Sequence, residues 1–117
     1  MWNKLIYSIV PLLILLFLLI LRPINASEKN SKEISGEVVH VYGEKDIVFR
    51  LKDDHSIYYI NNGVDFGLKT KNMKGLTEGV TVTIWYAKHW TPLDPKHKMK
   101  HITKFQINEE VVFSEWN

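Results

Sequence analysis

The residues best suited to chemistry in this 117-residue chain are concentrated between positions 85 and 101. Indole and phenol rings, imidazoles and lysine amines alternate there, with a single carboxylate among them. Aromatic rings offer stacking and hydrophobic contact, and lysine amines attract anions. The stretch therefore predicts a contact surface for an anionic partner. Its predicted binding residues are Trp85, His89, Trp90, Lys96, Lys98 and Lys100.

The same stretch has an alternative interpretation, as a site for a metal ion or another small ligand. Neutral imidazoles and a carboxylate are suitable ligands for zinc, and the candidates are His89, Asp94, His97 and His101. On a strand, His97 and His101 would share a face but lie ~13 Å apart, and the lysines between them would repel a cation. We keep this reading as the alternative, and we predict no cofactor.

The elements that must position these residues are predicted to be strands. Apolar residues alternate with polar ones along most of the chain after the first 33 residues, which is typical of half-buried strands. Alternation also requires that Trp85 and Tyr86 face opposite sides of the sheet. The predicted strands are 35–42, 47–52, 56–60, 80–87, 101–108 and 111–116, and one or two helical turns within 68–76 are expected to plug one end of a barrel.

Residues 5–21 form an uncharged apolar run, which is marginally long enough to cross a ~30 Å hydrocarbon layer. A retained transmembrane anchor is the favoured interpretation, and a signal peptide cleaved after Ala26 is the other. Both place the following domain outside the cytoplasm, in a single-pass membrane protein or, after cleavage, in a secreted one. The expected organisation is an anchor or signal segment over 1–24, a linker over 25–33 and a barrel domain over 34–117.

Three strands, a short helix and two further strands, in this order, resemble the OB-fold, a five-stranded Greek-key barrel. The likeness covers residues 35–108, and the last predicted strand is additional. We therefore expect an all-β fold with one short helix, an OB-like barrel of five to six strands behind an N-terminal transmembrane helix. Segments 58–63 and 89–95 also resemble small uncharacterised bacterial membrane-anchored proteins, a resemblance that implies no activity.

Composition and motifs argue against catalysis. The chain contains no cysteine, which excludes a thiol nucleophile and a zinc–thiolate site, and no serine stands on a recognisable nucleophile elbow. The thermonuclease family resembles this chain in its opening strands, but its phosphate clamp needs arginines and Arg50 is the only arginine in the domain. A net charge of +2 is also too mild for a dedicated nucleic-acid binder.

The sequence thus predicts a membrane-tethered extracytoplasmic binding or structural module without catalytic activity. The membrane is one partner, through the N-terminal segment. The partner of the aromatic and basic face is expected to be an anionic envelope polymer, a lipid headgroup or another protein.

Overall fold

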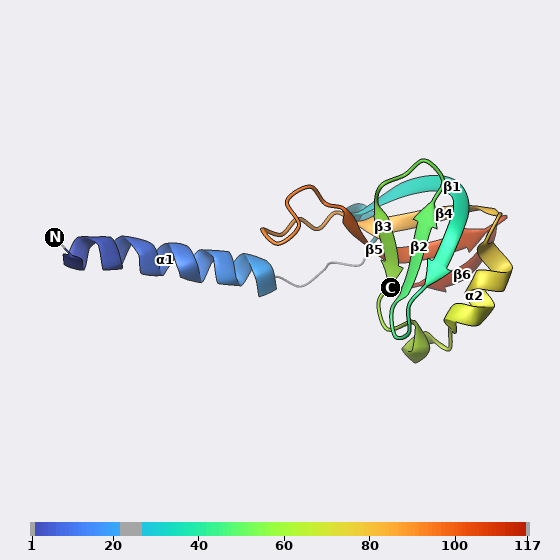
Figure 1. Ribbon diagram of the computed structural model, residues 1–117, viewed down its shortest axis with the longest axis horizontal. Coiled ribbons are helices and arrows are strands. Elements are labelled where there is room, and N and C mark those ends of the chain that lie inside the picture. Colours follow the sequence, from blue (N-terminus) through green and yellow to red (C-terminus); the bar gives the residue numbers. More distant parts are fainter. Residues whose placement is uncertain (1, 22–26, 117) are drawn as a thin grey trace.

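The computed structural model describes residues 2–21 and 27–116 of the chain (Figure 1). The predicted cleavage position after Ala26 lies outside these residues. In chain order the elements are α1 (Trp2–Leu21), η1 (Glu28–Asn30), β1 (Ser31–Tyr42), β2 (Ile47–Leu51), β3 (Ile57–Ile60), η2 (Gly63–Phe66), α2 (Thr70–Thr77), β4 (Thr81–Ala87), β5 (Met99–Ile107) and β6 (Glu110–Ser114).

The strands form a closed barrel. They are hydrogen-bonded in the order β3-β2-β1-β4-β5-β6, and a parallel pairing between β3 and β5 closes five of them into a ring with β6 added at one side. Two short helices, η2 and α2, lie between β3 and β4; α2 overlaps the helical turns predicted within residues 68–76, and η2 was not predicted. The prediction of a mostly-β, closed barrel is confirmed, and this arrangement is compatible with an OB-like barrel.

Strand β1 is long because it pairs with two strands, β4 and β2. Its first half pairs with β4, from Ser31 opposite Ala87 onward, and its second half pairs with β2 after an irregularity between Val38 and His40. At the crossing, a Cβ on Gly36 would lie 3.0 Å from the Leu51 side chain, so only glycine fits without adjustment. The strand also begins four residues earlier than predicted.

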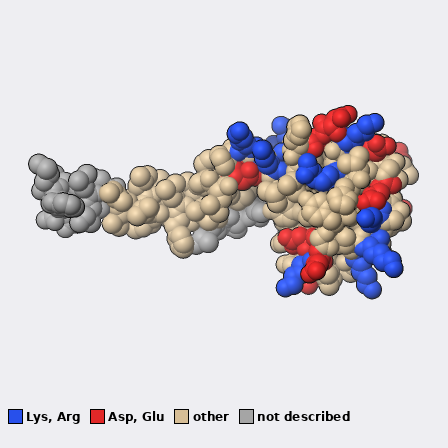
Figure 2. Space-filling view, in the orientation of Figure 1, with Lys and Arg blue, Asp and Glu red and all other residues tan. Residues whose placement is uncertain are grey.

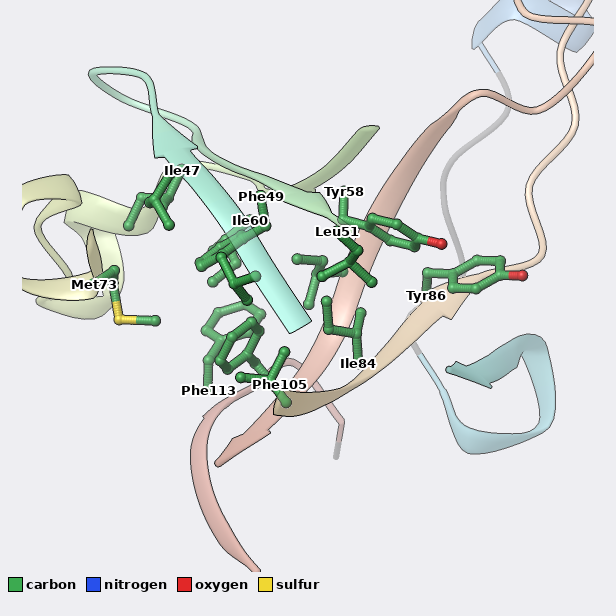
Figure 3. Close-up of a cluster of buried hydrophobic side chains, with 14 residues drawn as sticks. Ile47, Phe49, Leu51, Tyr58, Ile60, Met73, Ile84, Tyr86, Phe105 and Phe113 are labelled. Atoms are coloured by element: carbon green, nitrogen blue, oxygen red, sulfur yellow. The ribbon is translucent and has the colours of Figure 1, made fainter. Parts of the chain in front are cut away.

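The core fills the barrel with alternating side chains of the strands (Figure 3). The rings of Phe49 and Phe105 pack at a tilt of 35° with their centroids 4.8 Å apart, and Met73 of α2 is buried against the cluster. As predicted, Ile47, Phe49 and Leu51 face inward. All buried members of the cluster lie between Val38 and Phe113, and among the side chains that the structure describes none of α1 belongs to it.

One predicted face is wrong. Val111 and Phe113 were expected to point the same way from the last strand, yet Phe113 is buried and Val111 is exposed. Phe113 pairs with Phe105, whereas Val111 pairs with the next residue, Gln106, so β6 carries one extra residue between them. Such a bulge reverses the side-chain alternation beyond it.

The apolar run lies within α1, which Figure 1 shows apart from the barrel. Most of its large apolar side chains from Ile9 to Ile20 are exposed. Within the part of the chain that the structure describes, no helix is long and apolar enough to cross a membrane. The transmembrane anchor stays a prediction from the sequence.

Two glycine-to-alanine substitutions are expected to change stability in opposite directions. Gly43 adopts φ +107°, and a Cβ there would collide with the Asp46 carbonyl oxygen, so Gly43→Ala should lower the free energy of unfolding by roughly 1–3 kcal/mol. Gly75 lies in α2 with open space around it, so Gly75→Ala should raise it by about 0.5–1 kcal/mol. Urea unfolding measures both; a loss of stability in Gly75→Ala would contradict the assignment of α2.

Candidate functional site

An open hollow of about 520 Å³ lies where β4 ends, beside the start of β1. Its walls come from three places: β1, the end of β4, and the loop 88–98 between β4 and β5, which we call the β4–β5 loop. The described residues that line it carry positive charge, imidazoles and aromatic rings and include no acidic side chain. They are Lys32, Tyr86, Lys88, His89, Trp90 and His97.

Lys100, in β5, holds the β4–β5 loop in place. Its Nζ donates hydrogen bonds to the His97 carbonyl oxygen and to Ser56 Oγ, each at 2.6 Å. The same amine lies 5.5 Å from the centre of the Tyr86 ring and 5.9 Å from that of Tyr58, within the range of cation–π attraction. Lys100 thus connects the loop to the β2–β3 turn and supports the hollow rather than lining it.

Asp94 fixes the loop from within. Its two carboxylate oxygens accept hydrogen bonds from the backbone N–H groups of Lys98 and Met99, at 3.0 and 2.8 Å. Desolvation raises the pKa of Asp94, but these two bonds and the nearby charges of His97 and Lys100 outweigh it and hold the pKa below its ordinary value. The carboxylate is therefore ionised at neutral pH, and both of its oxygens are hydrogen-bonded to backbone N–H groups at the end of the loop.

His97 stands in the hollow with an uncommon backbone conformation. Its φ of +52° lies in the left-handed region, and its ring meets the edge or face of Tyr86 at 5.8 Å between centroids. Burial lowers the pKa of His97, and the positive charges of Lys100 and Lys32 lower it further against the opposing effect of Asp94. At neutral pH the imidazole is mainly uncharged, and it gains a proton only in more acidic solution.

Trp85 does not share the hollow with Trp90. Trp85 points away from Tyr86, as alternation requires, and packs edge to face against Trp116 at 5.8 Å. Lys104 Nζ lies 4.6 Å from the ring centroids of both tryptophans. This tryptophan pair belongs to the outer face of β4 and β5, and it forms a feature separate from the β4–β5 loop.

His101 is separated from the other histidines. It is buried in β5, its Nε2 lies 2.8 Å from Glu115 Oε2, and its ring packs against Tyr59. His89 and His97 line the hollow, and the Asp94 carboxylate is bonded to backbone. Among the residues that the structure describes, no three His, Cys, Asp or Glu side chains are grouped to hold a metal ion.

The remaining predicted residues belong to the β4–β5 loop. Trp90 lines the hollow, and its Nε1 donates a hydrogen bond to the Pro95 carbonyl oxygen at 3.1 Å. Lys96 and Lys98 are exposed on the loop. Lys32 is the lining residue that sequence reasoning missed most completely, because it lies in the segment predicted to be a linker.

Comparison with known proteins adds no relative. No protein-family model, no curated protein and no solved structure matches this chain. The resemblance to membrane-anchored proteins therefore has no support beyond the two sequence segments.

Replacing Lys100 should release the β4–β5 loop. In Lys100→Met the two hydrogen bonds of the amine are lost, so we expect faster amide exchange and lower order parameters in residues 88–98 by NMR relaxation, with the barrel strands unchanged. Lys104→Met is the matched control, because it removes a lysine of the same strand whose amine lies over the tryptophan pair. Equal loosening in both variants would show that Lys100 does not hold the loop.

The pKa of His97 should respond to the same substitution. We expect its imidazole resonances to titrate below the ordinary 6.5, and Lys100→Met to move the midpoint upward, because one positive charge is removed. Since the folded-state pKa is the lower one, the unfolded chain binds this proton first as pH falls, and the free energy of unfolding decreases below about pH 6.5. His97→Gln should remove that part of the decrease; an unchanged pH dependence would contradict the assignment.

Proposed function

We propose that the barrel is a membrane-tethered binding module outside the cytoplasm, which holds an anionic group of its partner in the hollow beside the β4–β5 loop. It performs no catalysis. The observation that carries this proposal is the composition of the hollow: two lysines, two histidines and two aromatic rings without an acidic side chain among its described lining. A cluster of this kind attracts anions and offers them stacking surfaces.

The order of the strands supports the proposal. We take the barrel to be an OB-fold, because three strands, a helix and two strands close through a parallel pairing of the third with the fifth. In OB-folds the loop between the fourth and fifth strands borders the ligand-binding face. Here that loop supplies Lys88, His89, Trp90 and His97 to the hollow.

The tether is proposed from the sequence. Residues 5–21 are uncharged and apolar, and lipid would cover the apolar side chains of α1 that are otherwise exposed to water. Lys32 follows Leu21 by eleven residues, a stretch of chain that spans at most about 40 Å when fully extended. A partner bound in the hollow would therefore lie near the membrane surface.

A second candidate is a small anionic ligand that enters the hollow from solution. The volume of about 520 Å³ favours it, since small-molecule sites occupy roughly 300–1,000 Å³. The same two lysines would serve either ligand. The dependence of affinity on the size of the anion distinguishes the two candidate functions. A polymeric partner binds more tightly as its length increases, and a small ligand does not.

Binding of tripolyphosphate, a soluble anion, tests the proposed site. In the full chain, Lys32→Ser/Lys88→Ser should weaken binding about three- to tenfold, since each exposed charge contact contributes up to ~1 kcal/mol. Affinity should also fall as salt is added. Isothermal titration calorimetry measures both effects.

The control is Lys71→Ser/Lys74→Ser, which removes the same charge from α2. It should leave affinity almost unchanged. If both double variants weaken binding equally, the anion responds to net charge alone and the hollow is not the site. If tripolyphosphate does not bind the unaltered chain, the proposed function is wrong.

A further inference from the structure

The β4–β5 loop exposes apolar side chains that an anion-binding hollow does not require. Leu93 is 75% exposed, more than any other large apolar side chain in the described residues, and Trp90 and Met99 are 47% and 45% exposed. They lie on or directly after a single loop of the chain. Exposed apolar side chains gathered in this way mark a contact with another surface.

The loop is held in this exposed form. Trp90 is bonded to the Pro95 carbonyl, the Asp94 carboxylate is bonded to the backbone that leads into β5, and Lys100 is bonded to the His97 carbonyl. These bonds connect the first part of the loop to its second part, and its second part to the start of β5. Leu93 therefore stays at the tip instead of folding back onto the barrel.

The loop that carries the apolar tip also carries exposed lysines. Lys88, Lys96 and Lys98 are exposed on the same loop, and its only acidic side chain, Asp94, has both carboxylate oxygens hydrogen-bonded to backbone N–H groups. Figure 2 shows basic side chains at this end of the barrel beside a small acidic area, and further basic side chains elsewhere on the barrel. A loop with exposed apolar side chains and exposed lysines suits the interface of an anionic membrane. Leucine and tryptophan enter the headgroup region there, and lysines contact the anionic headgroups.

The position of the loop favours the membrane that carries α1. Figure 1 shows the β4–β5 loop at the end of the barrel nearest to α1. The start of β1 lies at this end as well, since Ser31 pairs with Ala87. The short connection from Leu21 to Lys32 therefore brings this loop, and not α2, toward the bilayer.

We propose that the β4–β5 loop inserts Leu93 and Trp90 into the headgroup region of this anionic membrane, with a lipid phosphate held in the hollow. The inference rests on the proposed function and names its partner as the lipid headgroup. A soluble polyanion matches the lysines equally well, but it provides no apolar layer for Leu93. The lipid accounts for both the charge and the exposed leucine.

A single fluorescent label reports insertion, because the chain contains no cysteine. Leu93→Cys is labelled with the environment-sensitive dye NBD in the full chain and reconstituted into phosphatidylcholine vesicles with or without phosphatidylglycerol. Leu76→Cys is the matched control, since Leu76 is an exposed leucine on α2. With phosphatidylglycerol, the dye at 93 should shift to the blue and be quenched by a doxyl-labelled lipid, and the dye at 76 should do neither.

Unlabelled protein gives an independent measurement. Residues 27–117, which contain every buried residue of the described core cluster, should co-sediment with phosphatidylglycerol vesicles. Leu93→Ser should lower this affinity about tenfold, because one leucine is no longer buried in lipid, and Leu76→Ser should leave it unchanged. Free glycerol phosphate should compete weakly, because it offers the phosphate without the apolar layer.

The outcomes separate this inference from the proposed function. If the dye at 93 stays in water and Leu93→Ser sediments like the unaltered protein, insertion is wrong. Should tripolyphosphate nevertheless bind through Lys32 and Lys88, the anion site stands and its partner is soluble. Equal insertion in vesicles of phosphatidylcholine alone would contradict the role given to the headgroup charge.

Discussion

The parallel pairing of β3 with β5 is the contact on which both the barrel and its candidate site depend. It joins segments far apart in the chain, Ile57–Tyr59 and Met99–His101, and it closes the five-stranded ring. It also places Tyr58 opposite Lys100. Lys100 can therefore reach Ser56 and the His97 carbonyl at once, so the closure of the barrel and the shape of the β4–β5 loop follow from the same pairing.

The floor of the hollow is the point where the core changes from apolar to polar. Figure 3 shows the hydroxyl groups of Tyr58 and Tyr86 directed away from the apolar cluster. Tyr58 donates a hydrogen bond to Asp54 at 2.6 Å, and burial, with this carboxylate, raises the pKa of the Tyr58 phenol. The phenol stays protonated and remains a donor. The rings complete the core on one side and support the loop, through Lys100 and His97, on the other.

The fold was largely predictable because alternation is a local signal, whereas the composition of the site depends on non-local pairing. Ile84 and Tyr86 alternate with Trp85 in the sequence, and they do so in the barrel. Lys32 could not be found in this way, because Ser31, Lys32 and Glu33 carry no apolar pattern and become a strand only by pairing with β4. The packing of Trp85 could not be predicted for a related reason: its neighbour in space, Trp116, is distant in sequence. The extra residue in β6 left no turn signal that would have predicted it.

We propose that the β4–β5 loop and its hollow form the contact between this barrel and an anionic membrane. Amide NMR of the full chain in lipid nanodiscs tests it without any substitution, by comparing zwitterionic with phosphatidylglycerol-containing bilayers. The account predicts shift changes and contact with a lipid-borne spin label in Lys32 and residues 86–98, with α2 and β6 unaffected. Changes centred on α2 or on the tryptophan pair of Trp85 and Trp116, with the β4–β5 loop unchanged, would contradict it.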